Sequence, residues 1–351
     1  MLRSKSKVRL LFLLGLCLPM LFPGCGTSNA ASGGKNNQPE WVRDPYTKYD
    51  RQTNVAAVGT GSSREAAEKS AFGNLVSIFG QSISVDEKVS VSYQEAVKNG
   101  VAASWSENTA LDSVISSSAS LGSLVGAEIG DVWDDGRNFY AAAFLNKPRA
   151  IQVYSGIVSS NQKMIEKLVN IPSAERNTLD GFARYQFAAT VAEMTAPYVN
   201  LLSVIGGPAQ GIKFADDYRL EAYNITKAIP VNLRVRNDAS GRVGGAFAKA
   251  LSGLGFQSGR SNSRYLLDVN VITSPAVIAN SQFKWTRIEL SANLVDTVNG
   301  TVLLPYNLNS REGHISQAEA DNRAIIAAER QINEEYAGLL SDYLSRLLPK
   351  K

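Results

Sequence analysis

Cysteine and histidine are nearly absent from this chain of 351 residues. It has two cysteines, Cys17 and Cys25, and a single histidine, His314. One histidine excludes the multi-histidine zinc sites and leaves a Ser-His-Asp triad possible only through His314. The chain also lacks a Gly-x-Ser-x-Gly nucleophile elbow and a phosphate loop that ends in Gly-Lys-Ser/Thr. These absences argue against an enzyme.

An excess of one charge is also missing from most of the chain. The formal net charge is +4, with 36 basic and 32 acidic residues. Four of the basic residues, Arg3, Lys5, Lys7 and Arg9, lie at the very start, so the rest has 32 of each sign. The basic balance therefore gives no support for nucleic-acid binding.

The apolar run near the start is short. It extends from Leu10 to Phe22, whereas a membrane-spanning helix needs about 20 apolar residues. With basic residues before it, this run has the length of the apolar core of a signal peptide. The small residue Gly24 precedes Cys25, and the segment after it is rich in Gly, Ser and Asn. Such a composition predicts a flexible tether over residues 25–38.

This start resembles a bacterial lipoprotein signal, in which a small residue stands directly before a cysteine. The resemblance implies that residues 1–24 are removed by cleavage between Gly24 and Cys25, and that Cys25 carries a diacylglycerol with fatty acids such as palmitate. The alternative is an ordinary secretory signal with a chance cysteine. Cys17 would leave with the signal, so the mature chain would have one cysteine and no internal disulfide.

Residues 39–170 predict a first α+β domain. "NVAAVGTG" indicates a strand from Asn54 to Val58 that ends in a glycine turn, followed by a helix with a capping box of Ser62 and Glu65. "SISVDEKVSVSY" also reads as a strand, whereas residues 101–122 fit either a strand or a weak helix. "SLVGAEIGDVW" and "FYAAAFLN" flank the turn "DDGRN", which predicts a hairpin. A helix is expected from Lys147 to about Asn170, with Pro148 in its first turn.

The remainder predicts a helical connector over 171–206, with a kink at Pro197, and a second α/β domain over 207–351. A strand is expected at "IPVNLRVR", a helix at "GRVGGAFAKALSGLGF", and a strand at "RYLLDVNVITS". A long hairpin should follow, turned at Asn299-Gly300. The last helix has an apolar stripe that should pack on a sheet or helix: Ile325, Ala328, Ile332, Tyr336, Leu339, Tyr343 and Leu347. The fold class is thus α+β, with two domains that each pack a small, mostly antiparallel sheet on helices.

The first domain contains the segments "PEWV", "AAVGTGSSREAAEKSA" and "LVGAEIGDVWDDGRNFYAAAFLNKPRA". With these segments it resembles the LPP-twenty family of bacterial outer-membrane lipoproteins, and it is also similar to the N-terminal domain of flagellar assembly protein T. The resemblance extends from about Pro39 to Asn170 and implies a lipoprotein without known catalysis. The C-terminal half is weakly similar to periplasmic α/β domains of curli-secretion-type lipoproteins. The motif residues are Val58, Gly59, Gly61, Ala66, Ala67, Ala71, Trp133, Asp135, Tyr140, Ala143, Lys147 and Ala150.

Four other patterns favour structural roles over chemical ones. "VGTGSSREAA" has the strand-glycine-helix order of a phosphate site, but Arg64 stands where a third glycine is needed, so the glycines are expected to form a turn. His314 follows a glycine and is expected in a solvated loop. Asp131, Asp134 and Asp135 lack the spacing of a calcium loop, and the glutamates of "AAERQINEEY" indicate a solvated helix face. No cofactor and no metal site is expected.

The sequence therefore predicts a lipid-anchored lipoprotein of the bacterial outer membrane that acts as a non-catalytic interaction or assembly module. Its expected partners are the membrane, through Cys25, and an envelope protein, with no nucleic acid. One alternative is a binding protein for a small envelope ligand held between the domains. The other is a cell-wall hydrolase with paired carboxylates.

Overall fold

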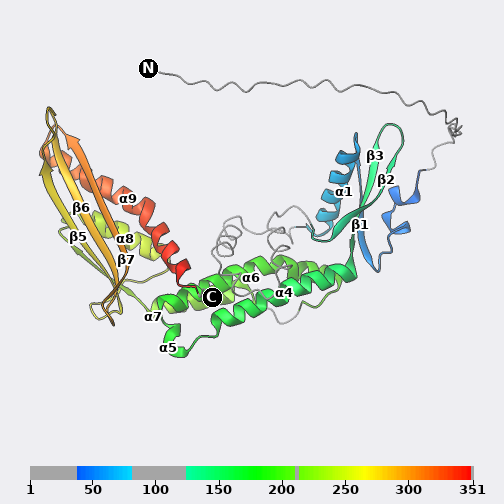
Figure 1. Ribbon diagram of the computed structural model, residues 1–351, viewed down its shortest axis with the longest axis horizontal. Helices are drawn as coiled ribbons and strands as arrows, with labels where there is room; N and C mark the ends of the chain where they lie inside the picture. Colours follow the sequence, from blue (N-terminus) through cyan, green and yellow to red (C-terminus); the bar gives the residue numbers. More distant parts are fainter. Residues whose placement is uncertain (1–37, 81–123, 210–212, 349–351) are drawn as a thin grey trace, which may run out of the picture. The chain divides into compact units, whose positions relative to one another are not determined.

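The computed structural model describes residues 38–80, 124–209 and 213–348 (Figure 1). Within these ranges the chain has seven α-helices, two short 3-10 helices and seven strands in two sheets of three and four strands. This confirms the predicted α+β class. The predicted signal, the cleavage site at Gly24 and Cys25, nearly all of the tether, the strand at "SISVDEKVSVSY" and residues 101–122 lie outside the described residues.

The first sheet consists of β1 (Asn54–Gly61), β2 (Ala127–Asp134) and β3 (Phe139–Asn146). Its strand order is β1-β3-β2 and both pairings are antiparallel. The predicted hairpin is therefore confirmed as β2–β3. Strand β1 is longer than expected, because it continues through the glycines that were predicted to form a turn.

Helix α1 (Arg64–Ile78) covers one face of this sheet. Its N-cap is Ser63, whose side chain accepts a hydrogen bond from the backbone N–H of Ala66, so the predicted cap at Ser62 is wrong by one residue. The helix buries Ala67, Ala71 and Leu75 completely. Small side chains at the first two positions let the helix lie close to the strands.

The glycines of β1 explain how close this approach is. A Cβ atom on Gly59 would lie 2.0 Å from the backbone nitrogen of Ala71, and one on Gly61 would lie 2.6 Å from that of Ala67. Real Cβ atoms do not come within 3.0 Å of other heavy atoms, so only glycine fits at either position. Both glycines therefore allow α1 to pack closely on β1. The predicted glycine turn is wrong, because both glycines lie within the strand.

The opposite face of the first sheet is covered by the 3-10 helices η1 (Glu40–Val42) and η2 (Pro45–Thr47) and the residues after them. Trp41 is buried, and the ring of Tyr49 stacks on that of Phe144 at 4.8 Å between centroids. The predicted "PEWV" segment thus forms part of the cover of this sheet.

Four helices follow the sheet: α4 (Lys147–Val169), α5 (Ser173–Arg176), α6 (Leu179–Ile205) and α7 (Ala215–Ala228). Helix α4 is the predicted helix, and α6 contains Pro197 without ending there. Helix α7 was not predicted. It packs on α6, and its exposed Phe214, Leu220 and Tyr223 obscure the apolar periodicity of the sequence.

The facing sides of α4 and α6 hold one buried polar pair. The amide of Asn161 donates to the hydroxyl of Thr195 at 2.9 Å, and this hydroxyl donates to the carbonyl of Val191 at 2.6 Å. Both side chains are almost fully buried, at 2% and 1% exposed. The pair fixes the two helices in one register, because an unpaired amide in this position would be costly.

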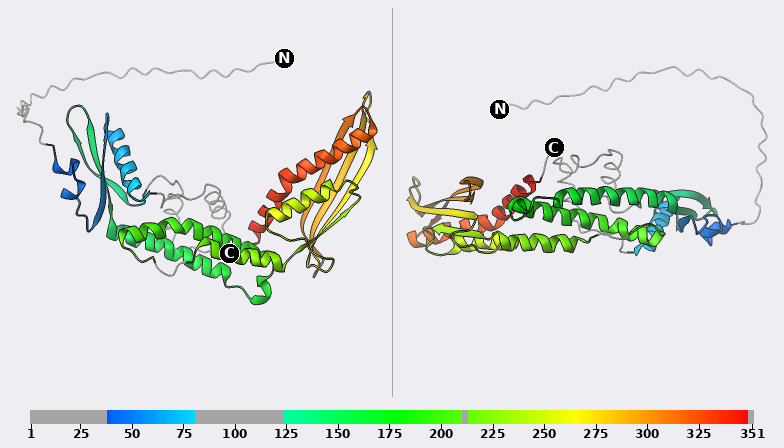
Figure 2. Two further views of the ribbon diagram at one scale, coloured as in Figure 1. Left: turned by 180° about the vertical axis from the view of Figure 1, so that it is seen from behind. Right: turned by 90° about the horizontal axis from the view of Figure 1, so that it is seen from below.

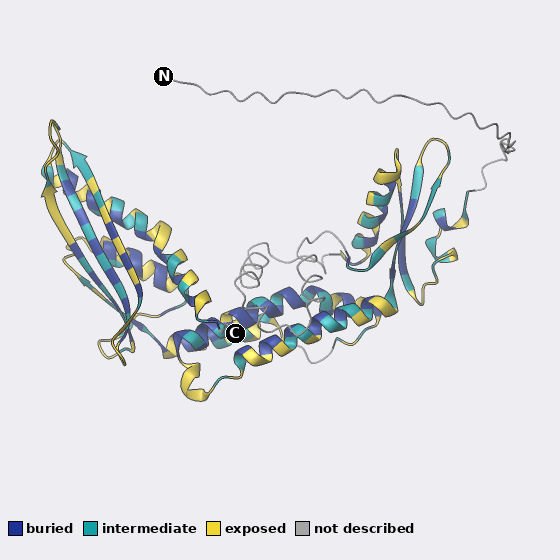
Figure 3. Ribbon diagram, viewed as in Figure 1, coloured by how far each residue is buried: buried dark blue, intermediate teal, exposed yellow. Residues whose placement is uncertain are grey.

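Helix α6 is, among the described residues, the one helix long and apolar enough to cross a membrane by length and composition. Its most apolar stretch is 61% buried inside the protein, and the helix packs against both α4 and α7. The core helix of a globular protein meets the same test. Figure 3 shows this buried character along α6.

The second sheet follows with the strand order β4-β5-β6-β7. Strands β4 and β5 are parallel, and the other two pairings are antiparallel. The predicted hairpin turn at Asn299-Gly300 is confirmed, with Gly300 in the left-handed region at φ 70°. The elements of this part are β4 (Val231–Arg236), α8 (Arg242–Gly253), β5 (Tyr265–Ala276), β6 (Lys284–Asp296), β7 (Thr301–His314) and α9 (Gln317–Arg346).

Helices α8 and α9 lie together on one face of this sheet (Figures 1 and 2). The buried stripe of α9 differs in part from the prediction: Leu340 is fully buried, whereas Leu339 is only partly buried. Leu339 and Leu340 are adjacent apolar residues, so the sequence alone does not decide which of them faces the sheet. The buried residues of α9 are Ala320, Ala324, Ala328, Ile332, Tyr336, Leu340 and Leu344.

The chain from Pro39 onward forms one compact unit. At the start of α6, the backbone N–H of Leu179 donates to the hydroxyl of Tyr265 on β5 at 3.1 Å, and the ring of Phe182 packs on that of Phe256. The division into 39–170, 171–206 and 207–351 stays a prediction.

Candidate interaction surface and ligand pocket

The single histidine lies at the end of a strand and not in the predicted loop. His314 is the last residue of β7, opposite Lys284 of β6. Its Nδ1 accepts a long hydrogen bond, 3.4 Å, from the backbone N–H of Ser316. Among the described residues no carboxylate is bonded to this ring, so the geometry offers no triad around His314.

The acidic residues near the β2–β3 turn separate into two structural sites. Asp135 accepts hydrogen bonds from the backbone N–H groups of Arg137 and Asn138 at 2.8 and 2.7 Å, which closes the turn. Asp131 lies on β2 and pairs with Lys48 at 2.6 Å and with the hydroxyl of Tyr49. In the described part of the chain, no group of three His, Cys, Asp or Glu residues is arranged to hold a metal ion.

The pKa values of the second site follow from its contacts. Burial by itself would raise the pKa of the Asp131 carboxyl, but hydrogen bonds from Lys48 and Tyr49 outweigh it and lower this pKa. Burial and the neighbouring Asp131 carboxylate raise the pKa of Tyr49. Asp131 is thus an ionised anchor for the segment that covers the sheet, and neither group is prepared for proton transfer near neutral pH.

The motif residues of the predicted family resemblance have structural roles. Trp133 packs against Tyr140 at 5.3 Å between ring centroids, and the hydroxyl of Tyr140 donates to Asp135 at 3.2 Å. The ammonium group of Lys147 donates to the carbonyl of Arg51 at 2.8 Å. The motif therefore describes how the hairpin is closed and how α4 is joined to the sheet.

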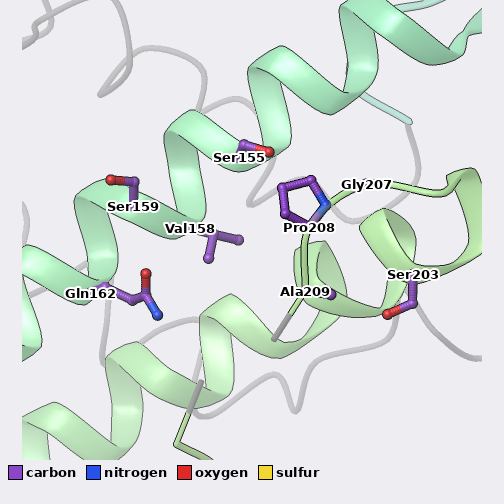
Figure 4. Close-up of a pocket in the computed structure, with 8 residues that line it drawn as sticks. All are labelled: Ser155, Val158, Ser159, Gln162, Ser203, Gly207, Pro208 and Ala209. Atoms are coloured by element: carbon purple, nitrogen blue, oxygen red, sulfur yellow. The ribbon is translucent and has the colours of Figure 1, made fainter. Parts of the chain in front are cut away.

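The helices form one hollow of about 680 Å³ beside α4 and the end of α6 (Figure 4). Side chains of α4 line one side, and the segment Gly207–Ala209 lies opposite. The lining residues described by the structure carry no charge, and the Oγ of Ser155 is buried without a partner. This chemistry suits a neutral ligand. The lining residues are Ser155, Val158, Ser159, Gln162, Ser203, Gly207, Pro208 and Ala209.

The edge strands of the two sheets differ in how they are covered. The amide of Asn74 on α1 donates to the carbonyl of Val58 on β1 at 2.9 Å, so a helix side chain satisfies part of that edge. Among the described strands, β7 pairs with β6 alone, and it is 14 residues long. Its protective feature is Pro305, which cannot donate a backbone hydrogen bond. From Tyr306 to His314 the edge of β7 has no such interruption.

Comparison with known proteins gives one family. Residues 39–146 match the model of the LPP20 lipoprotein family. This confirms the resemblance predicted for the first domain, and it supports a lipoprotein of the cell envelope. The likeness to flagellar assembly protein T and to curli-type lipoproteins is not shown. Comparison with curated proteins gave no match.

Solved structures show distant similarity. The secreted protein HP1454 from Helicobacter pylori is 13% identical, with a TM-score of 0.38, and the match covers 80% of this chain and 97% of that one. A minor lipoprotein from Acinetobacter baumannii is 15% identical over 35% of this chain and 98% of its own, with a TM-score of 0.25. Lipoprotein GNA1162 from Neisseria meningitidis is 16% identical over 30% and 96%, with a TM-score of 0.21. Likenesses at this level do not indicate a function.

Proposed function

We propose that this chain is a lipoprotein of the bacterial outer membrane, anchored by a diacylated Cys25, that acts as a non-catalytic interaction module. The unpaired edge of β7 is the observation that carries the interaction role. An extended segment of an envelope protein can add to such an edge, with main-chain hydrogen bonds supplying the affinity. The match of residues 39–146 to a lipoprotein family supports the anchor.

The anchor is tested by replacing Cys25 with alanine. Acyl chains contribute about 0.8 kcal/mol per buried CH₂ group, so two or more chains hold a protein on a membrane. We expect the parent to fractionate with outer membranes and to show an acylated N-terminal cysteine by mass spectrometry. The C25A variant should stay unprocessed or become soluble. A mature N-terminus at Gly26 or beyond would contradict the anchor.

The edge is tested by photo-crosslinking in intact cells. A photoreactive amino acid replaces Ile315, which is exposed directly after the last residue of β7, and in a control it replaces Lys249, which is exposed on α8. We expect a discrete protein adduct from position 315 and none from position 249. Equal labelling from both positions, or none from 315, would remove the edge from the proposal and leave the anchor standing.

The second candidate function is binding of a small neutral ligand in the hollow beside α4. The orphaned hydroxyl of Ser155 favours it, because a buried polar atom without a partner is satisfied by a bound group. Replacing Ser203 by leucine would fill the hollow. If envelope extracts raise the melting temperature of the parent but not that of S203L, a ligand binds there.

A further inference from the structure

The face of the second sheet that points away from α8 and α9 is not covered by any described element. Along β6, buried residues alternate with partly exposed ones (Figure 3). The buried set contacts the helices, so the partly exposed set forms the open face. On β6 and β7 the open face includes a ladder of four directly opposed pairs: Trp285 with Gly313, Arg287 with Arg311, Glu289 with Asn309, and Ser291 with Asn307.

The first pair provides a fixed aromatic surface. A Cβ atom on Gly313 would lie 2.9 Å from atoms of the Trp285 ring, so the indole lies directly on the backbone of β7. Its Nε1 donates to the hydroxyl of Ser281 at 2.7 Å, which fixes the rotation of the ring. The ring is partly exposed. A flat aromatic ring held in this way is suited to stack on the C–H face of a sugar.

The second pair places two positive charges side by side. Arg287 and Arg311 are directly opposite on neighbouring strands, an arrangement that destabilises a sheet. Arg287 has only a 3.4 Å contact with Glu289, and its Nε is buried without a partner. No carboxylate of the described residues pairs with Arg311. An anionic group bound between the two guanidinium groups would remove the repulsion.

The remaining pairs border a hollow of about 400 Å³. Asn270, Asn307, Asn309, Ser291 and Glu289 place amide, hydroxyl and carboxylate groups around it. These groups donate and accept hydrogen bonds, as sugar hydroxyls and acetamido groups require. From Trp285 to Ser291 the ladder extends about 20 Å along β6, which is longer than a single sugar ring.

We infer that this open face binds an anionic polymer of the cell wall, namely a peptidoglycan strand with its attached peptides. A sugar ring stacks on Trp285, a carboxylate of the attached peptide lies between Arg287 and Arg311, and the next sugar meets the amides and hydroxyls at the hollow. Four arginines and two acids lie on this side of the sheet, and Arg234 and Arg236 share Asp268. The remaining excess of positive charge suits an anionic polymer. The residues are Arg234, Arg236, Arg287 and Arg311, with Asp268 and Glu289. The choice of polymer rests on the envelope location proposed above.

The test is co-sedimentation of the purified full-length chain, in detergent, with purified peptidoglycan sacculi. The variants are Trp285→Ala and Arg311→Gln, and each has a matched control elsewhere, Tyr223→Ala on α7 and Arg330→Gln on α9. All four controls and variants are exposed or partly exposed positions. We expect R311Q to weaken binding on the order of tenfold, because it removes a charge-assisted hydrogen bond. W285A should weaken binding as well, because it removes the ring on which the sugar stacks. The controls should bind as the parent does.

The outcomes separate this inference from the anchor. Binding by the parent that W285A and R311Q leave unchanged would overturn it, as would no binding by the parent. R311Q removes the repulsion between Arg287 and Arg311 and should melt at or slightly above the temperature of the parent, so it decides the result if W285A does not fold. Tighter binding to lipopolysaccharide micelles than to sacculi, lost in the same variants, would assign the face to a phosphorylated lipid and overturn the peptidoglycan. None of these results changes where C25A fractionates.

Discussion

Replacing Gly59 by alanine tests whether backbone contact between β1 and α1 holds the first sheet. The new Cβ would lie 2.0 Å from the Ala71 nitrogen and 2.5 Å from the carbonyl carbon of Ser70. Both are backbone atoms, so no rotamer change removes the clash, and α1 has to move away by more than 1 Å to restore ordinary contact of 3.4–4 Å. That movement opens gaps around Ala71 and Leu75, which are fully buried.

Overpacking of a core costs about 1–3 kcal/mol, and we expect the upper end, about 3 kcal/mol, because the obstacle is backbone. At about 2–4 °C per kcal/mol for a domain of 150–250 residues, the melting temperature should fall by roughly 6 °C or more. Gly73→Ala is the matched control. Gly73 lies in α1 with open space around its Cα, so G73A should stabilise by about 0.5–1 kcal/mol. Equal melting of G59A and the parent, with G73A behaving as expected, would refute the close contact.

Three further predictions rest on the other contacts. Leu340→Asp should lower the free energy of unfolding in urea by about 3 kcal/mol or more, because it buries an unpaired charge. Leu339→Asp is at a partly exposed position and should cost far less, so equal losses would contradict the assignment of Leu340 to the buried side of α9. Thr195→Val should lower the free energy of unfolding by about 1–3 kcal/mol, because it leaves the amide of Asn161 unpaired. Adding Asn161→Leu should recover part of that stability, and a double variant no more stable than T195V would argue against the hydrogen-bonded pair. Burial alone would raise the pKa of Asp296, but hydrogen bonds from Arg264 and the N–H of Val298 lower it. The stability that this carboxylate contributes is therefore present above its unfolded pKa of about 3.9 and is lost as the pH falls toward and through its lower folded pKa, so the stability gap between the parent and Asp296→Asn should narrow as the pH falls below about 4, and a gap that stays constant over that range would disprove the reasoning.

The sequence predicted those elements whose signals are local. The β2–β3 hairpin and the β6–β7 hairpin have turn residues with a required backbone geometry, and α4 has a cap and an N-terminal proline. The errors occurred where local signals agree with more than one structure. Gly59 and Gly61 favour a turn from sequence, because the helix backbone that requires them there is visible only in three dimensions.

The candidate surfaces were less accessible from sequence. The predicted lipidation site at Cys25 depends on the start of the chain alone. The opposition of Arg287 and Arg311, in contrast, depends on the register between β6 and β7, which a bulge shifts between Leu294 and Val295. Helix α7 was missed because its apolar residues point both toward α6 and toward solvent.

The strand order of the first sheet has a consequence for how the chain folds. Strand β1 and helix α1 are separated by Ser62 and Ser63 alone, so their contact is local and forms quickly. The partner of β1, however, is β3, which is made only after the whole of 81–123 and β2. The sheet cannot close until that late strand arrives, and contacts of such long sequence separation slow folding. In a chain synthesised from its N-terminus, this sheet therefore stays open until residue 146 has emerged.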